Sequence, residues 1–151
     1  MFEPKNILVP TDFSKFADAA LNQAADIAAQ YGSSIYLLHV LGMSEQIQQC
    51  AVDYCLNAEV VKQLEKETLK AAKEKVKKEA AAIVKSKKVK VAFDIKKGSP
   101  AETILHEEKA NKIDLIVIAS HGKSGISKQL LGSVTDKVVK GAKCPVVVVK
   151  P

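Results

Sequence analysis

The sequence contains no arginine and no tryptophan, and aromatic residues make up only 5% of its 151 residues. All 23 basic residues are therefore lysines, and the formal net charge is +6. Arginine is the side chain that most often recognises guanine, and aromatic rings are the platforms on which bases stack. The densest lysine run, residues 70–90, is interrupted by glutamates and is typical of a solvated helix face. Nucleic acid is therefore not an expected partner.

Long apolar runs are also absent. No stretch approaches the roughly 18 apolar residues that a membrane helix needs, and the N-terminus lacks the pattern of a signal peptide. Cysteine is scarce, and the odd count and wide spacing of Cys50, Cys55 and Cys144 favour reduced thiols over a disulfide framework or a zinc site. With 47% hydrophobic and 26% charged residues, we expect a single soluble, cytoplasmic domain over residues 1–151, with no membrane partner.

Several well-known functional motifs are missing. No segment matches the P-loop pattern G-x-x-x-x-G-K-[ST], and the stretch after the first apolar run, "PTDFSKFA", has no glycine for a dinucleotide fingerprint. There is no G-x-S-x-G elbow and no histidine pair of the metalloprotease type. His39, His106 and His121 lie in three separate segments, so no catalytic triad is indicated. The sequence offers no nucleophile, general base or carboxylate pair placed for phosphoryl transfer.

Apolar runs alternate with helical periodicity along the whole chain. Continuous apolar runs at 6–10, 34–41 and 114–119 predict buried strands, the run at 146–150 predicts a fifth strand, and residues 89–98 predict a strand nearer the sheet edge. Helices are predicted between them, including a long one over 58–85 whose apolar stripe begins at Val61 and Leu64. This alternation requires an α/β fold, a parallel sheet with helices on both faces. Residues 42–57 are expected to be irregular, the least ordered part, and able to close over a ligand.

Helix starts are marked by capping residues. Asp12 or Ser14 can cap the first helix. At the third helix, Ser99 is the expected cap, followed by Pro100 and a capping-box glutamate. The same logic predicts Ser133 as the cap of the last helix.

The loop after the fourth strand carries spaced glycines. In parallel sheets, ligands bind beyond the carboxyl ends of the strands, where the strand order reverses. Gly122 follows the fourth strand, and nine residues separate it from Gly132-Ser133, which opens a helix. Glycine lets a backbone approach a ligand, a helix N-terminus attracts anions, and Ser133 and Thr135 add hydroxyl donors. The pattern suits a polyphosphate cradle, but a simple turn at Gly122 and a capping Ser133 explain it equally well.

The whole chain resembles the universal stress protein family. The segments "KNILVPTDFS", "GSPAETIL", "DLIVIASHGKSG", "LLGSVTDKVV" and "CPVVVVKP" follow the family's pattern in order and cover essentially all of the chain. The resemblance implies a single-domain open parallel sheet of five strands, in the order 3-2-1-4-5, and a homodimer. One branch of the family binds ATP through G-x2-G-x9-G-[ST], and another lacks this motif and binds no nucleotide.

The chain departs from the G-x2-G-x9-G-[ST] motif at one position, because Ala119 stands in place of the first glycine. If the position needs a positive φ, alanine costs about 1–2 kcal/mol. If it needs only a small side chain, alanine adds a methyl group near the nucleotide. Because Gly122 and Gly132-Ser133 are in place, we expect binding to be weakened rather than abolished.

The resemblance also implies a base-binding half. Asp12 would accept hydrogen bonds from ribose or adenine, although helix capping is its structural alternative. The backbone of Val40 would read the adenine edge, Ile118 would pack against the base, and His121 would either donate to phosphate or face water. The expected nucleotide contacts are Pro10, Thr11, Asp12, Val40, Ile118, Ala119, His121, Gly122, Gly132, Ser133, Val134 and Thr135.

These inferences favour a cytoplasmic universal stress protein that binds ATP, with Mg²⁺ or Mn²⁺ on the phosphates. Its role would be regulatory or protective, with at most slow ATP hydrolysis and no catalytic or metal-ligating residues. The alternatives are a dimeric interaction module of the same fold without nucleotide, and a hydrolase or nucleotidyl transferase, whose extra phosphate motifs are absent. The terminal run "PVVVV" predicts an edge strand that pairs across a two-fold axis in a homodimer, unless Lys150 and Pro151 protect it.

Overall fold

The computed structural model describes residues 1–42, 57–122 and 130–150. The expected lid over 42–57 therefore lies outside the described part, apart from its two end residues, and so do Cys50 and Cys55. The elements run in the order β1 (Asn6–Pro10), α1 (Lys15–Tyr31), β2 (Ser34–Leu41), α3 (Ala58–Lys87), β3 (Lys90–Lys97), α4 (Pro100–Ala110), β4 (Leu115–Ala119), α5 (Ser133–Gly141) and β5 (Val146–Val149).

The strands form one parallel sheet in the order β3-β2-β1-β4-β5, which confirms the predicted topology. At the centre, Ile7 of β1 is in register with Ile35 of β2 on one side and with Leu115 of β4 on the other. All five residues of β4 are buried, as expected of a strand covered on both faces. Strand β3 lies at one edge, as predicted, and β5 lies at the other.

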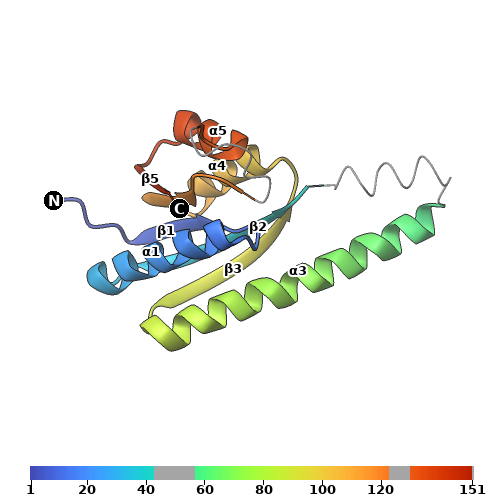
Figure 1. The fold of residues 1–151 in the computed structure, drawn as a ribbon, viewed down its shortest axis with the longest axis horizontal. Coiled ribbons are helices and arrows are strands. Elements are labelled where there is room, and N and C mark those ends of the chain that lie inside the picture. The colour runs from blue at the N-terminus through green and yellow to red at the C-terminus, as the bar shows by residue number, and fades with distance from the viewer. Residues whose placement is uncertain (43–56, 123–129, 151) are drawn as a thin grey trace.

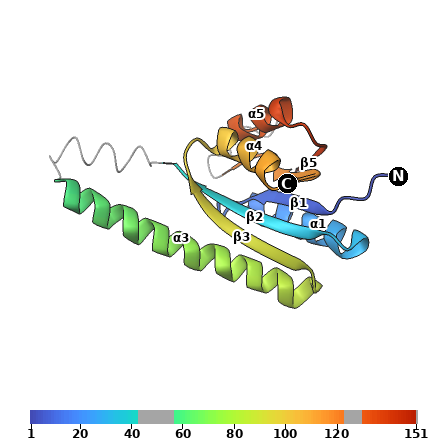
Figure 2. The same cartoon turned by 180° about the vertical axis from the view of Figure 1, so that it is seen from behind.

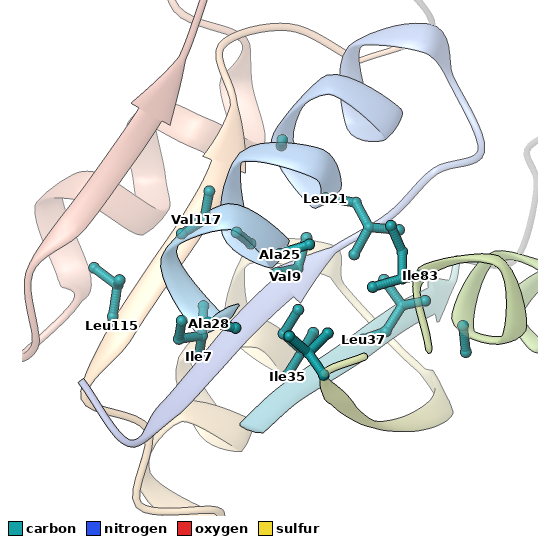
Figure 3. Packing of buried hydrophobic residues seen from close by; sticks show 14 of the residues in the cluster. Ile7, Val9, Leu21, Ala25, Ala28, Ile35, Leu37, Ile83, Leu115 and Val117 are labelled. Atoms are coloured by element: carbon teal, nitrogen blue, oxygen red, sulfur yellow. The ribbon is translucent and has the colours of Figure 1, made fainter. Parts of the chain in front are cut away.

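Helices cover both faces of the sheet, with α1 and α3 on one side and α4 and α5 on the other (Figures 1 and 2). Helix α1 buries mostly alanines, including Ala25 and Ala28, so its backbone packs close to the central strands (Figure 3). Ile83 of α3 extends this layer over Leu37 of β2 (Figure 3). The second layer packs Ile104 of α4 and Val138 of α5 against the opposite face.

Helix α3 is only partly covered by the sheet. Its predicted apolar stripe is buried from Ala72 onward, at Ala72, Val76, Ala80 and Ile83, whereas the earlier turns are exposed or half-buried. Figure 1 shows these first turns extending past the end of β3. Val61 and Leu64, expected in the core, are therefore half-buried, because no strand lies opposite them among the described residues.

The helix caps differ from the prediction at two of the three starts. Ser14 caps α1 as expected, and its Oγ accepts a hydrogen bond from the Ala17 N–H at 3.2 Å. Ser99 occupies the cap position of α4 but makes no side-chain cap hydrogen bond. At α5 the cap is Gly132, and Ser133 is already the first helical residue, so the predicted Ser133 cap is wrong.

Two buried glutamates fix α4 in place. Glu107 accepts hydrogen bonds from the Tyr36 hydroxyl at 2.9 Å and the Asn111 amide at 2.8 Å. Although burial opposes its charge, these bonds hold the pKa of Glu107 below its ordinary value. Glu108, 3% exposed, accepts through Oε1 from the backbone N–H groups of Lys143 and Cys144, at 2.7 and 2.8 Å. Glu108 thereby ties α4 to the turn that leads into β5.

The thiol of Cys144 lies in the same turn. Burial, together with the neighbouring Glu108 carboxylate, raises the pKa of the thiol to about 12. Since the thiolate is the reactive form, Cys144 stays protonated and unreactive at neutral pH.

We predict that Glu108→Ala destabilises the protein by about 2–5 kcal/mol, because two hydrogen bonds to a charged acceptor are lost and two backbone donors lose their partner. Urea unfolding followed by circular dichroism measures the change. Glu102→Ala, at an exposed position of the same helix, is the matched control. A loss below about 1 kcal/mol would show that water replaces the carboxylate without penalty.

Candidate functional site

A cavity of about 350 Å³ opens at the carboxyl edge of the sheet, near the neighbouring strands β1 and β4, where the strand order reverses. This is the point of reversal at which parallel sheets bind ligands. The structure brings every expected contact residue into the wall of this one cavity: Pro10, Thr11, Asp12, Val40, Ile118, Ala119, His121, Gly122, Gly132, Ser133, Val134 and Thr135.

Other lining residues were not predicted: Ala17, Leu38, His39, Pro100 and Ile104. Leu38 and Ile104 are buried side chains of the α4 layer, so they read in the sequence as ordinary core residues. His39 precedes Val40 near the carboxyl end of β2, and its place beside an expected contact residue was a usable signal. Ala17 and Pro100 lie in the first turns of α1 and α4, whose N-termini point toward this edge, and only the packed fold determines this placement.

The loop between β1 and α1 forms one wall of the cavity. Asp12 accepts a hydrogen bond from the Ser14 N–H through Oδ1 at 3.0 Å, which shapes the turn before α1. Its other oxygen, Oδ2, lies 2.7 Å from where a β-carbon on Gly122 would stand. Asp12 is therefore part of the turn and also faces the glycine loop, so its structural and binding interpretations are compatible.

Backbone packing joins the end of β4 to the start of α5. The Gly132 N–H donates to the Ser120 carbonyl at 2.8 Å, and the Thr135 hydroxyl donates to the Ala119 carbonyl at 2.7 Å. A β-carbon on Gly132 would lie 3.3 Å from the Ser120 carbonyl oxygen and 3.9 Å from the Gly122 nitrogen. The close approach favours glycine here, because a side chain would require the Ser120 carbonyl to shift by a few tenths of an ångström, whereas the φ of −58° at Gly132 suits any residue.

The start of α5 presents backbone donors to the cavity. The first intrahelical bond is made by the Asp136 N–H to the Gly132 carbonyl at 2.9 Å, so the N–H groups of Ser133, Val134 and Thr135 precede the helical ladder. Their partial positive charge favours an anion. No lysine lines the cavity within the described part of the chain, so backbone N–H groups at helix starts, those of α5 among them, contribute positive potential there.

The hydroxyl of Thr135 does not have the expected role. It is 4% exposed and its proton is directed to the Ala119 carbonyl, so it anchors the helix to β4 and is not a hydroxyl donor for a ligand. Ser133, in contrast, is exposed at the first helical position.

His121 is half-buried and does not simply face water. Its Nδ1 lies 2.8 Å from the Ser120 hydroxyl, and its ring is 6.3 Å from that of Phe16, centroid to centroid. Its Nε2 is buried and makes no hydrogen bond to the described residues. The Ser120 contact therefore fixes the ring in the cavity wall and leaves Nε2 for a ligand or water.

Ala119 is accommodated without backbone strain. It is the last residue of β4, in register with Val149, and it is not among the residues with positive φ. Its methyl group, 7% exposed, packs in the α1 layer together with Val117, whereas Ile118 faces the opposite layer. The weakening expected from this alanine therefore finds no support in the strand geometry.

A half-buried carboxyl lies behind the cavity wall. Glu79 of α3 accepts a hydrogen bond from the Thr11 hydroxyl at 3.4 Å. Burial, aided by the nearby carboxylates of Asp18 and Asp12, raises the pKa of Glu79 to about 7 against the opposing effect of the Thr11 bond.

Among the described residues, no three His, Cys, Asp or Glu side chains gather closely enough to hold a metal ion. Over the same residues, no helix combines the length and apolar character needed to cross a membrane.

The fold is that of an α/β protein with a cavity at the carboxyl edge of its sheet. The model of the universal stress protein family matches residues 3–150, and the chain belongs to this family. It is 36% identical over 146 residues to the universal stress protein MJ0531 of Methanocaldococcus jannaschii, covering 97% of this chain and 82% of that protein.

Solved structures give the same result. The structure of MJ0577, a universal stress protein of the same organism, has a TM-score of 0.83 at 31% identity, covering 99% of this chain and 98% of that chain. Two structures at 20% identity share the fold, with TM-scores of 0.65 and 0.67. The first is a universal stress protein in complex with cAMP, and the second is one from Archaeoglobus fulgidus in complex with dAMP.

We predict that Ala119→Gly lowers stability by about 1–2 kcal/mol, because a buried methyl group is lost and glycine is unfavourable in a strand. Nucleotide affinity should change less than about twofold, since the methyl group packs in the core. Urea unfolding and titration calorimetry measure the two effects. Tighter nucleotide binding without loss of stability would show that the methyl group occupies ligand space.

Proposed function

We propose that this universal stress protein binds an adenine nucleotide, ATP foremost, in the cavity at the carboxyl edge of the sheet. One observation carries the proposal: close packing at Gly132 places the free N–H groups of α5 beside an apolar slot at the point of strand reversal. An anionic group and an apolar ring are thereby accommodated in one cavity. Two proteins with this fold form complexes with cAMP and dAMP, ligands that each combine a phosphate with an adenine ring.

In this proposal the adenine ring lies between Ile118 and Leu38, next to the backbone of Val40. Asp12 is placed for the ribose, because a carboxylate accepts hydrogen bonds from hydroxyl groups. The phosphates lie at the N–H groups of Ser133 and Val134, where the helix dipole stabilises negative charge. Because the described residues provide no metal cluster, Mg²⁺ or Mn²⁺ would be bound mainly by the phosphates themselves.

The proposed role is regulatory or protective, exercised in the cytoplasm, and is not metabolic. The described cavity wall contains one carboxylate, Asp12, and no pair of carboxylates placed to activate water. Slow ATP hydrolysis would be the upper limit. An interaction module without nucleotide is the alternative function, and the site geometry gives no reason to prefer it.

Titration calorimetry with ATP, in the presence and absence of Mg²⁺, tests the proposal. We predict that Gly132→Val weakens ATP binding by about ten- to a hundredfold, because the branched side chain meets the Ser120 carbonyl and displaces the α5 N–H donors. AMP, which lacks the outer phosphates, should lose much less. Ser133→Ala, which keeps the backbone donor, is the matched control and should lose little.

Folding of each variant is checked by urea unfolding before affinities are compared. Equal losses for ATP and AMP would place the polyphosphate elsewhere. Absence of ATP binding in the parent protein, together with no adenine nucleotide in freshly purified material by mass spectrometry, would favour the interaction module.

We also propose that the chain forms a homodimer through β5. This strand lies at the sheet edge, and Val147 is 36% exposed. Exposed apolar edge strands tend to pair with another chain. Pairing of two β5 edges would give hydrogen-bond partners to the open N–H and carbonyl groups of both strands.

Sedimentation velocity at tens of micromolar protein should show a dimer, and Val147→Lys should shift it toward monomer by placing like charges at the two-fold axis. A parent protein that sediments as a monomer, with or without nucleotide, would contradict this assembly.

A further inference from the structure

The strongest unexplained feature outside the cavity is Glu79 on α3. Its Oε1 accepts the hydrogen bond from the Thr11 hydroxyl at 3.4 Å. Its Oε2 is buried and receives no hydrogen bond from a donor among the described residues, whereas the Asp18 carboxylate lies close enough to accept a hydrogen bond from the protonated group. A buried carboxylate oxygen without a partner is costly when the group is charged. Glu79 therefore occupies an environment that disfavours its ionised form, directly behind a residue of the cavity wall.

Thr11 controls the shape of the loop before α1. Its hydroxyl oxygen also accepts a hydrogen bond from the Phe13 N–H at 3.1 Å, and Phe13 has a positive φ of 65°. Its carbonyl oxygen lies 2.7 Å from His39 Nδ1, which must carry the proton because a carbonyl only accepts. A non-glycine residue with positive φ is held there by its surroundings. The Thr11 side chain is one of these restraints, and Glu79 holds it from outside the cavity.

The ring of Phe13 adds a second link to α3. It lies 4.4 Å from the His39 ring, centroid to centroid, and Lys75 Nζ lies 5.3 Å from its centroid. Lys75 and Glu79 are four residues apart, on one face of the helix. The same face of α3 therefore contacts the loop through an ion–ring contact and a hydrogen bond.

The charged groups around Glu79 come from every element packed against it. Asp18 of α1 and Asp12 of the loop are carboxylates that disfavour a further negative charge. Lys75 of α3 is the nearby cation and is directed at Phe13, and His39 of β2 lies beyond Thr11. Burial and these carboxylates raise the pKa of Glu79 to about 7. The group therefore changes charge within the physiological range.

We propose that Glu79 is a positioning residue for the nucleotide site, which holds the Thr11 loop in its binding shape when protonated and releases it when ionised. The inference rests on the proposed function and adds regulation to it: nucleotide affinity falls as the pH rises.

The direction in which nucleotide affinity changes with pH follows from proton linkage. In the packed arrangement Glu79 keeps its proton up to about pH 7, whereas a carboxyl group released into water loses it near the ordinary value of 4.5. A bound polyphosphate adds negative charge on the far side of the loop and so favours the protonated form further. Binding therefore takes up a proton, and the affinity falls by at most about tenfold per pH unit above the pKa.

The test measures the ATP affinity of the parent and of Glu79→Gln by calorimetry between about pH 6 and 8.5. At each pH, the affinity of the parent is divided by that of Glu79→Gln. Glutamine keeps an oxygen to accept the Thr11 hydroxyl but carries no charge. The ratio cancels the titration of the ATP phosphates and of His39, which affect both proteins. We expect the parent to lose about three- to tenfold relative to Glu79→Gln across this range. Glu74→Gln, at an exposed position on the same helix, should follow the parent.

A second variant separates charge from position. Glu79→Ala removes the acceptor as well as the charge, so its ATP affinity should be lower than that of Glu79→Gln at every pH and should lack the Glu79-dependent slope. Urea unfolding checks each fold. Glu79→Gln should be at least as stable as the parent above pH 7, because a carboxyl whose pKa is raised on folding loses stability as the pH rises from about 4.5 to 7.

A measurement without nucleotide tests the loop directly. The amide resonance of Phe13 should titrate with a midpoint near 7 in the parent and should lose this component in Glu79→Gln, while any His39 titration remains in both. If ATP binds with the same pH profile in parent and Glu79→Gln, the inference is wrong and the proposed function stands. If ATP fails to bind at any pH, the proposed function fails, and the Phe13 titration alone decides whether Glu79 controls the loop.

Discussion

The candidate site depends on one short hydrogen bond, from the Gly132 N–H to the Ser120 carbonyl at 2.8 Å. It joins a fully buried strand to the first turn of an amphipathic helix, although the two are separated along the chain by the loop between them. The hydroxyl of Thr135 repeats the connection one residue earlier on β4. This junction holds the start of α5 beside the end of β4 and so sets the direction of the α5 N–H groups. A ligand at this edge would meet donors that are already in place, and such preorganisation lowers the entropic cost of binding.

The second constraint is electrostatic. Three glutamates are removed from water to different degrees, and each is handled in a different way. Glu107 is surrounded by donors and stays ionised, and Glu108 accepts two backbone N–H groups in a turn. Glu79 has a single hydroxyl partner and two acidic neighbours. The first two fasten α4 to the sheet and to the entry of β5. Of these three, only Glu79 lies beside the cavity and titrates near neutrality. It is therefore the one suited to regulate nucleotide binding.

Much of the fold was predictable because its determinants are local. Continuous apolar runs predicted the buried strands, and their alternation with helical periodicity predicted the parallel sheet, while the resemblance supplied the strand order. The residues of the glycine loop were predictable because they follow the fourth strand and open a helix, whereas the resemblance supplied the residues of the base-binding half. Leu38 and Ile104 were not predicted as cavity residues, because the sequence does not distinguish a core side chain that borders a cavity from one that is fully packed. The cap of α5 was predicted one residue too late, because serine is a common capping residue. The preference for glycine at position 132 comes from the nearby Ser120 carbonyl, which the sequence does not reveal.

The uneven burial of α3 has a consequence for how the protein melts. Its turns from Ala72 onward are anchored by apolar packing, whereas those from Ala58 to Leu69 contribute little buried surface. An isolated helix of that length is marginal in water, so the first turns are maintained mainly by propagation from the anchored half and by the Asn57 cap, whose Oδ1 accepts from the Val60 N–H at 2.9 Å. Helicity should accordingly be lost from this end first, at temperatures where the sheet is still intact. The helical signal of the whole protein would then decline gradually before the cooperative transition, and that early slope would report on one helix end alone.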